Sequence, residues 1–152
     1  MSKIKIALAS DHGGFTLKNQ IKDYLQSKGY EICDFGTSST ESCDYPDFAL
    51  PAAEAVAFGT CGRGIIVCTT GIGVSMVANK VPGVRCALCH DTYCAELTRR
   101  HNDANVLAMG GNVVSEDKAL EIVDIFLKTE FEGGRHLRRV EKISAVEKKY
   151  CK

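Results

Sequence analysis

The sequence predicts an α/β protein built on a five-stranded, parallel, doubly wound sheet. Short apolar segments alternate five times with segments of helical periodicity over the 152 residues. The third apolar segment, Gly64-Ile65-Ile66-Val67-Cys68, shows no polar alternation, as expected for a central strand covered on both faces. The length suits a single domain over residues 1–152 with one core.

The elements follow one another as strand, helix, strand along the chain. In the first helix, Leu17, Ile21 and Leu25 stand at helical spacing, and Gly29 follows as a stop. Ser115 is expected to cap the fifth helix. The expected strands are residues 4–10, 30–35, 64–68, 84–90 and 106–109. The expected helices are residues 15–28, 47–58, 71–80, 92–100 and 115–128, with a polar loop over 38–45.

An extended C-terminal helix is expected over residues 135–150. Apolar residues recur in it at helical spacing, at Leu137, Val140, Ile143, Val146 and Tyr150. No sixth strand follows to receive this helix, so its apolar face must pack on its own domain or on another subunit. We therefore expect a dimer.

The charge balance and the cysteine content exclude several classes of protein. Nineteen basic residues balance nineteen acidic ones, so no net field favours nucleic acid or an anionic membrane. No apolar run approaches the roughly 20 residues of a membrane span, and the apolar start before Asp11 is too short for a signal peptide. Eight cysteines without a secretion signal fit a reduced cytoplasmic setting better than a disulfide framework.

Cys86-x-x-Cys89, with Cys94 nearby, suggests a metal site by its spacing. Residues 84–90 are expected to form a buried strand, in which positions three apart point to opposite faces. No second Cys/His pair stands at zinc spacing. We therefore expect no metal centre.

Two strand ends carry the polar and glycine-rich segments expected of a binding site. Ligands of open α/β sheets bind beyond the carboxyl ends of the strands where the winding reverses, usually between the first and third strands. Those strands end here in Ser10-Asp11-His12-Gly13-Gly14 and Cys68-Thr69-Thr70-Gly71-Ile72-Gly73. The functional site is expected between them.

Cys68 ends a buried strand and precedes a glycine-rich turn into a helix. The free N–H groups at such a helix start favour a thiolate and can hold an oxyanion. A base beside an oxyanion hole is what proton abstraction next to a carbonyl requires. Position alone also permits Cys68 to be one more buried core cysteine.

The segment Thr70-Gly71-Ile72-Gly73 has a competing interpretation as a dinucleotide-binding fingerprint. That pattern is incomplete, because Met76 stands where its third glycine belongs. A phosphate-binding loop of the Walker type is also absent from the sequence.

Three residues in the second half of the chain carry further candidate chemistry. His101 can move a proton at a sugar oxygen near neutral pH, although a histidine at a helix end is more often a cap or a surface residue. Arg135 and Arg139 lie four apart on one helix face, where they clamp a phosphate or form a solvated basic face. His12 can complete such a clamp across a subunit boundary.

Seven segments form a set that is specific as a combination, and they span nearly the whole chain. They are Ser10-Asp11-His12-Gly13-Gly14, Asp44-Tyr45-Pro46, Cys68-Thr69-Thr70-Gly71-Ile72-Gly73, Ala78-Asn79-Lys80, His101-Asn102-Asp103, Asn105-Val106-Leu107-Ala108 and Glu132-Gly133-Gly134-Arg135-His136. In this combination the sequence resembles the type B ribose-5-phosphate isomerases of the RpiB/LacAB group.

The resemblance implies a Rossmann-like three-layer α/β/α sandwich and a homodimer, often paired into a dimer of dimers, with active sites between subunits. It implies interconversion of ribose 5-phosphate and ribulose 5-phosphate in the pentose phosphate pathway, through a cis-enediolate and without a cofactor. Cys68 looks like the base that shuttles the proton. His101 looks like the group that assists ring opening, and Thr70 like a hydroxyl that helps that step or the enediolate.

The resemblance also implies substrate contacts. Contacts to the sugar hydroxyls are expected from Asp11 and Asn102, a wall of the pocket from Tyr45, and phosphate ligands from His12, Arg135 and Arg139. The glycine-rich turn completes the expected site with Thr69, Gly71, Ile72 and Gly73.

Two positions depart from the family pattern. Thr69 stands where many relatives have glycine, which can narrow the anion pocket. Many relatives also carry an arginine where this chain has Asn112, which is expected to contact substrate without adding a charge. Phosphate binding then depends more on the two C-terminal arginines, or the substrate is a six-carbon sugar phosphate such as galactose 6-phosphate or allose 6-phosphate.

A non-catalytic, sugar-phosphate-binding partner subunit is an alternative from another functional class. Relatives that act as paired unlike subunits tend to lack part of the catalytic set. The presence of Cys68, Thr70 and His101 together argues against this alternative.

Overall fold

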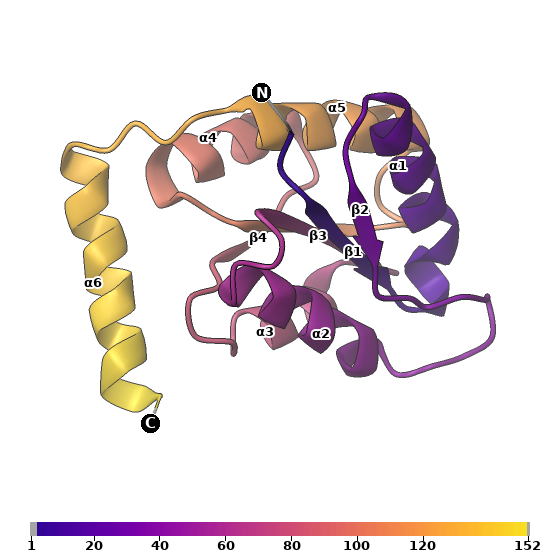
Figure 1. The fold of residues 1–152 in the computed structure, drawn as a ribbon, viewed down its shortest axis with the longest axis horizontal. Coiled ribbons are helices and arrows are strands. Elements are labelled where there is room, and N and C mark those ends of the chain that lie inside the picture. Colours follow the sequence, from indigo (N-terminus) through magenta and orange to yellow (C-terminus); the bar gives the residue numbers. More distant parts are fainter. Residues whose placement is uncertain (1–2, 152) are drawn as a thin grey trace.

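Five parallel strands form the centre of the molecule in a computed structural model that describes residues 3–151 (Figure 1). The strand order is β2-β1-β3-β5-β4, so the winding reverses between β1 and β3. The strands are β1 (Ile6–Ser10), β2 (Ile32–Asp34), β3 (Arg63–Cys68), β4 (Cys86–Leu88) and β5 (Val106–Gly110).

Helices cover both faces of this sheet (Figure 1). α1, α4 and α5 pack on one face and α2 and α3 on the other, which confirms the three-layer, doubly wound prediction. A 3-10 turn over His12–Gly14 joins β1 to α1. The helices are α1 (Phe15–Ser27), α2 (Tyr45–Ala57), α3 (Ile72–Ala78), α4 (Thr92–Asn102), α5 (Glu116–Lys128) and α6 (Arg135–Tyr150).

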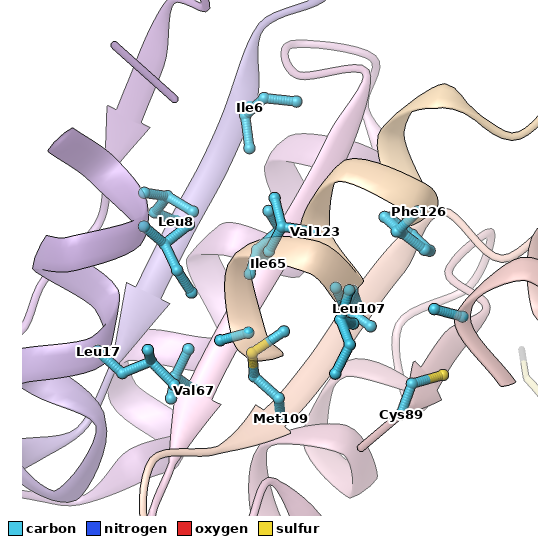
Figure 2. Close-up of a cluster of buried hydrophobic side chains, with 14 of the residues drawn as sticks. Ile6, Leu8, Leu17, Ile65, Val67, Cys89, Leu107, Met109, Val123 and Phe126 are labelled. Atoms are coloured by element: carbon cyan, nitrogen blue, oxygen red, sulfur yellow. The ribbon is translucent and has the colours of Figure 1, made fainter. Parts of the chain in front are cut away.

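The central strands send alternate side chains into two separate cores. Figure 2 shows the first core, where Leu8 and Ile65 of the sheet pack with Phe126 of α5. On the other face Ala7 and Ile66 pack against α2, whose buried face is mostly alanine. Burial of β3 from both faces confirms the expectation drawn from its unbroken apolar run.

Two helix boundaries differ from the sequence prediction in ways that concern the site. α2 begins at Tyr45 rather than at residue 47, because the fixed φ of Pro46 suits the first helical turn. α4 extends to Asn102 and ends where Asp103 adopts a left-handed φ of 48°. His101 and Asn102 therefore belong to α4 instead of following it.

β4 is shorter than the strand expected over residues 84–90. It pairs only with β5. At its start, asparagine side chains accept backbone N–H groups that no neighbouring strand accepts. Oδ1 of Asn79 accepts the N–H of Cys86, and Oδ1 of Asn105 accepts the N–H of Arg85, each over 2.8 Å. The remaining element ends coincide with the prediction or differ from it by at most two residues.

α6 lies beside the β4 edge of the sheet, outside both helical layers (Figure 1). Near its end, Oε1 of Glu147 accepts the N–H of Gly83 over 2.9 Å. A groove of about 750 Å³ separates α6 from the β4 edge, with Ile143, Val146 and Tyr150 on its α6 side. These three side chains remain exposed, so the apolar stripe is only partly covered by its own domain.

Within residues 3–151, none of the helices has the length and apolar character that crossing a bilayer requires.

Candidate active site

Three loops meet at the carboxyl ends of β1, β3 and β5, where the sequence placed the site. The N–H of Gly111 donates to the carbonyl of Cys68 over 2.8 Å, and the N–H of Asn112 to the carbonyl of Thr69 over 3.1 Å. A Cβ atom on Gly13 would lie 2.1 Å from Oγ1 of Thr69. The β1 loop, the β3 loop and the β5 loop therefore pack as one unit.

Cys68 is the last residue of β3, and its sulfur is held by the turn that follows it. Gly71 adopts a φ of 78°, a conformation that glycine takes without strain. Its N–H donates to Sγ of Cys68 over 3.1 Å. A backbone donor at this distance stabilises a thiolate. Cys68 is 5% exposed, so little of this residue faces solvent in the single chain.

The rest of the β3 loop faces outward. Thr70 is exposed, and its Oγ1 accepts the N–H of Ile72 over 3.3 Å, which leaves the hydroxyl proton of Thr70 free to donate to a ligand. The ring of Tyr45 lies against Gly73, where a Cβ atom would come within 2.7 Å of Cζ. Tyr45 therefore borders this loop, at the start of α2.

The β1 loop brings Asp11 and His12 to the same place. Oδ1 of Asp11 accepts the N–H of Gly14 over 3.1 Å, so this buried carboxylate caps the 3-10 turn and keeps Oδ2 for another donor. Nδ1 of His12 accepts the N–H of Cys43 over 3.2 Å. Because an amide N–H can only donate, the proton of a neutral His12 ring is on Nε2.

The predicted site residues at this edge of the sheet form what we call the loop group. It contains Asp11, His12, Tyr45, Cys68, Thr69, Thr70, Gly71, Ile72, Gly73 and Asn112.

The other four predicted site residues form what we call the helix group, and the structure places it elsewhere in the chain. His101 and Asn102 end α4, and Arg135 and Arg139 lie in the first turns of α6. The loop after α4 leads to Asn105, whose carbonyl accepts the N–H of Gly64 at the start of β3. Cys68 lies at the other end of β3, about 13 Å away for four residues of strand. One chain therefore does not bring the two groups together.

Guanidinium groups fix the end of α4. Nη2 of Arg85 donates to the carbonyl of Asp103 over 2.9 Å, and Nη1 of Arg99 donates to the carbonyl of Ala104 over 2.6 Å. Arg99 is almost fully buried and also pairs with the carboxylate of Asp103 over 2.8 Å. These cations pair with carbonyl groups in the turn that follows α4 and fix the path of the chain after His101 and Asn102.

His136 and Glu132 accompany His101, although the sequence assigned neither of them a role. The rings of His101 and His136 stack with centroids 4.1 Å apart and planes 8° from parallel. Burial lowers the pKa of His136, and the nearby charges of His101 and Arg135 act in the same direction. The hydrogen bond from Arg100 lowers the pKa of Glu132. In the sequence, the i, i+4 spacing of Glu132 and His136 is the feature that could have predicted this cluster.

Several of the cysteines away from Cys68 pack into the core, whereas Cys94 and Cys151 are exposed. Cys86 and Cys89 pack into opposite cores, as expected for positions three apart along an extended segment. Burial raises the pKa of Cys89 to about 12 and that of Cys61 to about 11. Both remain protonated thiols at neutral pH.

The chain is similar to known proteins over most of its length. Residues 6–143 match the Ribose/Galactose Isomerase family. Ribose-5-phosphate isomerase B of Escherichia coli is 48% identical over 145 residues, which cover 95% of this chain and 97% of that protein.

Two solved structures share both the fold and the sequence. The structure of Clostridium thermocellum ribose-5-phosphate isomerase B matches with a TM-score of 0.95 and 58% identity, covering 96% of this chain and 99% of that one. The enzyme of the same name from Mycoplasma genitalium, with bound ribulose-5-phosphate, matches with a TM-score of 0.92 and 44% identity, covering 95% and 96%. Because the family match and both superpositions span most of its length, this chain belongs to the Ribose/Galactose Isomerase family.

Proposed function

We propose that this chain is an aldose–ketose isomerase that interconverts ribose 5-phosphate and ribulose 5-phosphate. The observation that carries this function is the Sγ of Cys68, held 3.1 Å from the Gly71 amide at the meeting point of three loops. The names of the solved relatives, one of them with bound ribulose-5-phosphate, support the choice of sugar.

The isomerisation transfers one proton between neighbouring carbons. In the open-chain aldose, the thiolate of Cys68 takes the hydrogen of C2, and the electron pair forms a C1–C2 double bond. Negative charge then develops on the C1 oxygen, where the amides that begin α3 and the hydroxyl of Thr70 stabilise it. The O2 proton passes to O1, and the thiol returns its proton to C1. Atoms and charges balance without a metal or redox cofactor.

The substrate enters mainly as a closed ring, so a second acid–base group must open it. An imidazole suits this step, because it donates and accepts protons near neutral pH. His101 is the candidate, and Arg135 and Arg139 are exposed nearby on α6 to bind the phosphate. His12 offers an Nε2–H donor to the same phosphate from the loop group.

A second copy of the chain completes each site in this proposal. Within one chain the loop group and the helix group lie at opposite ends of β3, so a homodimer is needed to join them. Exposed apolar side chains beside both groups support such an interface, namely Ile72 and Met76 of α3 and Ile143, Val146 and Tyr150 of α6. Pairing of these dimers into tetramers belongs to the same proposal.

The proposed setting is the cytoplasm. All eight cysteines are free, which suits a reducing compartment. None of the helices described between residues 3 and 151 is long and apolar enough to span a membrane.

A substrate panel tests the function with the purified chain alone. Ribose 5-phosphate, galactose 6-phosphate and allose 6-phosphate are compared by kcat/KM, and we expect the highest value for ribose 5-phosphate. A higher value for a six-carbon substrate selects the alternative that the family name and Asn112 keep open. If the chain binds these sugar phosphates but converts none of the three, the alternative of a non-catalytic partner subunit is correct.

A further inference from the structure

His101, Glu132 and His136 form a compact cluster of metal-ligating side chains outside the loop group. One ligand atom from each of them lies within 4.8 Å of the other two. Nε2 of His136 and Oε2 of Glu132 are 3.3 Å apart. Two histidines and one carboxylate are a ligand set that zinc takes in proteins, with a remaining position left open.

The distances fit a tetrahedral ion with a small adjustment. Zinc bonds of about 2.1 Å to nitrogen and oxygen place tetrahedral ligands about 3.4 Å apart. The pair formed by His136 and Glu132 already has this separation. The stacked rings direct their lone pairs in parallel planes, so the His101 ring must turn before both ring nitrogens can face one ion.

His136 directs a polar atom into this cluster. The residue is 6% exposed, and its buried Nε2 makes no hydrogen bond among the described residues, although Oε2 of Glu132 lies at ion-pair distance, 3.3 Å away. Coordination of a cation by these two atoms would satisfy both of them.

The carboxylate is already oriented by its other oxygen. Oε1 of Glu132 accepts from Nε of Arg100 over 2.6 Å, and the Glu132 N–H donates to the Arg100 carbonyl over 3.1 Å. Oε2 is thereby directed towards His136, as an outer-shell partner directs a metal ligand. The positive charges of Arg100 and Arg135 oppose a cation, so we expect the binding to be weak and reversible.

We propose that His101, Glu132 and His136 bind one divalent cation of the zinc class, and that the bound ion inhibits isomerisation. Coordination occupies the imidazole lone pair that His101 needs to move the ring-opening proton. The inhibitory part rests on the proposed function, whereas the binding part does not.

Binding is tested without any sugar present, by calorimetry with ZnCl₂ and by visible spectroscopy with CoCl₂. The experiment uses the Cys94→Ser/Cys151→Ser protein, because these exposed thiols also bind zinc. We expect one ion per chain and a cobalt spectrum without a thiolate charge-transfer band. Glu132→Gln and His136→Gln should each weaken binding more than about tenfold, with circular dichroism as the folding control. Equal affinity in a folded Glu132→Gln protein, or a thiolate band, overturns the site.

Inhibition is tested separately, with each variant normalised to its own zinc-free rate. Zinc should inhibit the parent protein, EDTA should restore its rate, and Glu132→Gln should require more than about ten times as much zinc. If zinc saturates the site and the isomerisation rate does not change, the inhibitory part of the proposal is wrong. If the chain turns over no sugar phosphate, the proposed function fails while the calorimetry still decides the metal site.

Discussion

The backbone N–H of Cys43 donates to Nδ1 of His12 over 3.2 Å and joins segments 31 residues apart. This bond leaves the ring proton of neutral His12 on Nε2, the atom that remains available to a ligand. The loop before α2 thereby sets which nitrogen of His12 can donate to a phosphate.

Cys43→Pro removes that donor while keeping His12. We expect KM for the sugar phosphate to rise about fivefold, the equivalent of one lost hydrogen bond, with a smaller change in kcat. Nitrogen-15 NMR of labelled histidine should show His12 losing its fixed Nε2–H form. Cys43→Ser keeps the backbone donor and should match the parent protein. An unchanged His12 spectrum in Cys43→Pro would contradict this role.

Cys68→Ala removes the proposed base and should lower kcat by about 10²–10⁴-fold with little change in KM. Steady-state kinetics with ribose 5-phosphate measure both constants. Cys94→Ser, which alters an exposed thiol on α4, is the matched control and should keep the parent rate. Near-parental turnover of Cys68→Ala would remove the sulfur from the mechanism.

Mixing two inactive proteins tests whether each site uses two chains. Cys68→Ala disables the loop group, and His101→Asn disables the helix group. If partners exchange freely, half of the dimers are mixed and each holds one intact site, so about a quarter of the parental activity should return. A mixture that exchanges subunits yet stays inactive would place both groups within one chain.

The ion pair between Lys18 and Asp34 should control stability in acid. Lys18 is 2% exposed, and its Nζ lies 2.8 Å from Oδ1 of Asp34. Burial opposes the charge on Asp34, but the hydrogen bonds from Lys18, the Gly36 amide and Lys22 outweigh it and hold its pKa below the ordinary value. The stabilisation is therefore complete above the unfolded-state pKa of about 3.9 and is lost as the pH falls through the lower folded-state value.

Denaturant unfolding of Asp34→Asn at pH 7 and below pH 4 measures this effect. At pH 7 the variant leaves Lys18 without its charged partner, which should cost about 3 kcal/mol. Its stability should then change less in acid than that of the parent protein. Glu31→Gln, which breaks the exposed pair with Lys5, should cost much less stability than Asp34→Asn. Equal losses at pH 7 in both variants would contradict the prediction.

Local patterns were sufficient to predict the fold and one edge of the site. Periodicity and glycine positions placed the strands, and the rule for parallel sheets placed Cys68 beside Asp11 at one edge. The opposite orientation of Cys86 and Cys89 followed from strand geometry alone.

Contacts between distant segments could not be predicted in this way. The bond from Cys43 to His12 depends on the path of an irregular loop, which has no periodic signal. Lys18 stands on a helix where a solvated position was equally consistent with the sequence, and its burial depends on Asp34 at the sheet edge. The stacking of the His136 ring on the His101 ring depends on where α6 lies relative to α4, which no local pattern specifies.

The close packing of the three loops restricts how substrate preference can change. A Cβ atom on Gly110 would lie 2.7 Å from the carbonyl carbon of Thr70, and one on Gly111 would lie 2.9 Å from the carbonyl oxygen of Gly13. Enlarging either residue would displace the backbone around the sulfur and damage the chemistry itself. We therefore expect adaptation to longer or shorter sugars to use exposed side chains beside these loops, such as Tyr45 and Asn112, while Gly110 and Gly111 stay small.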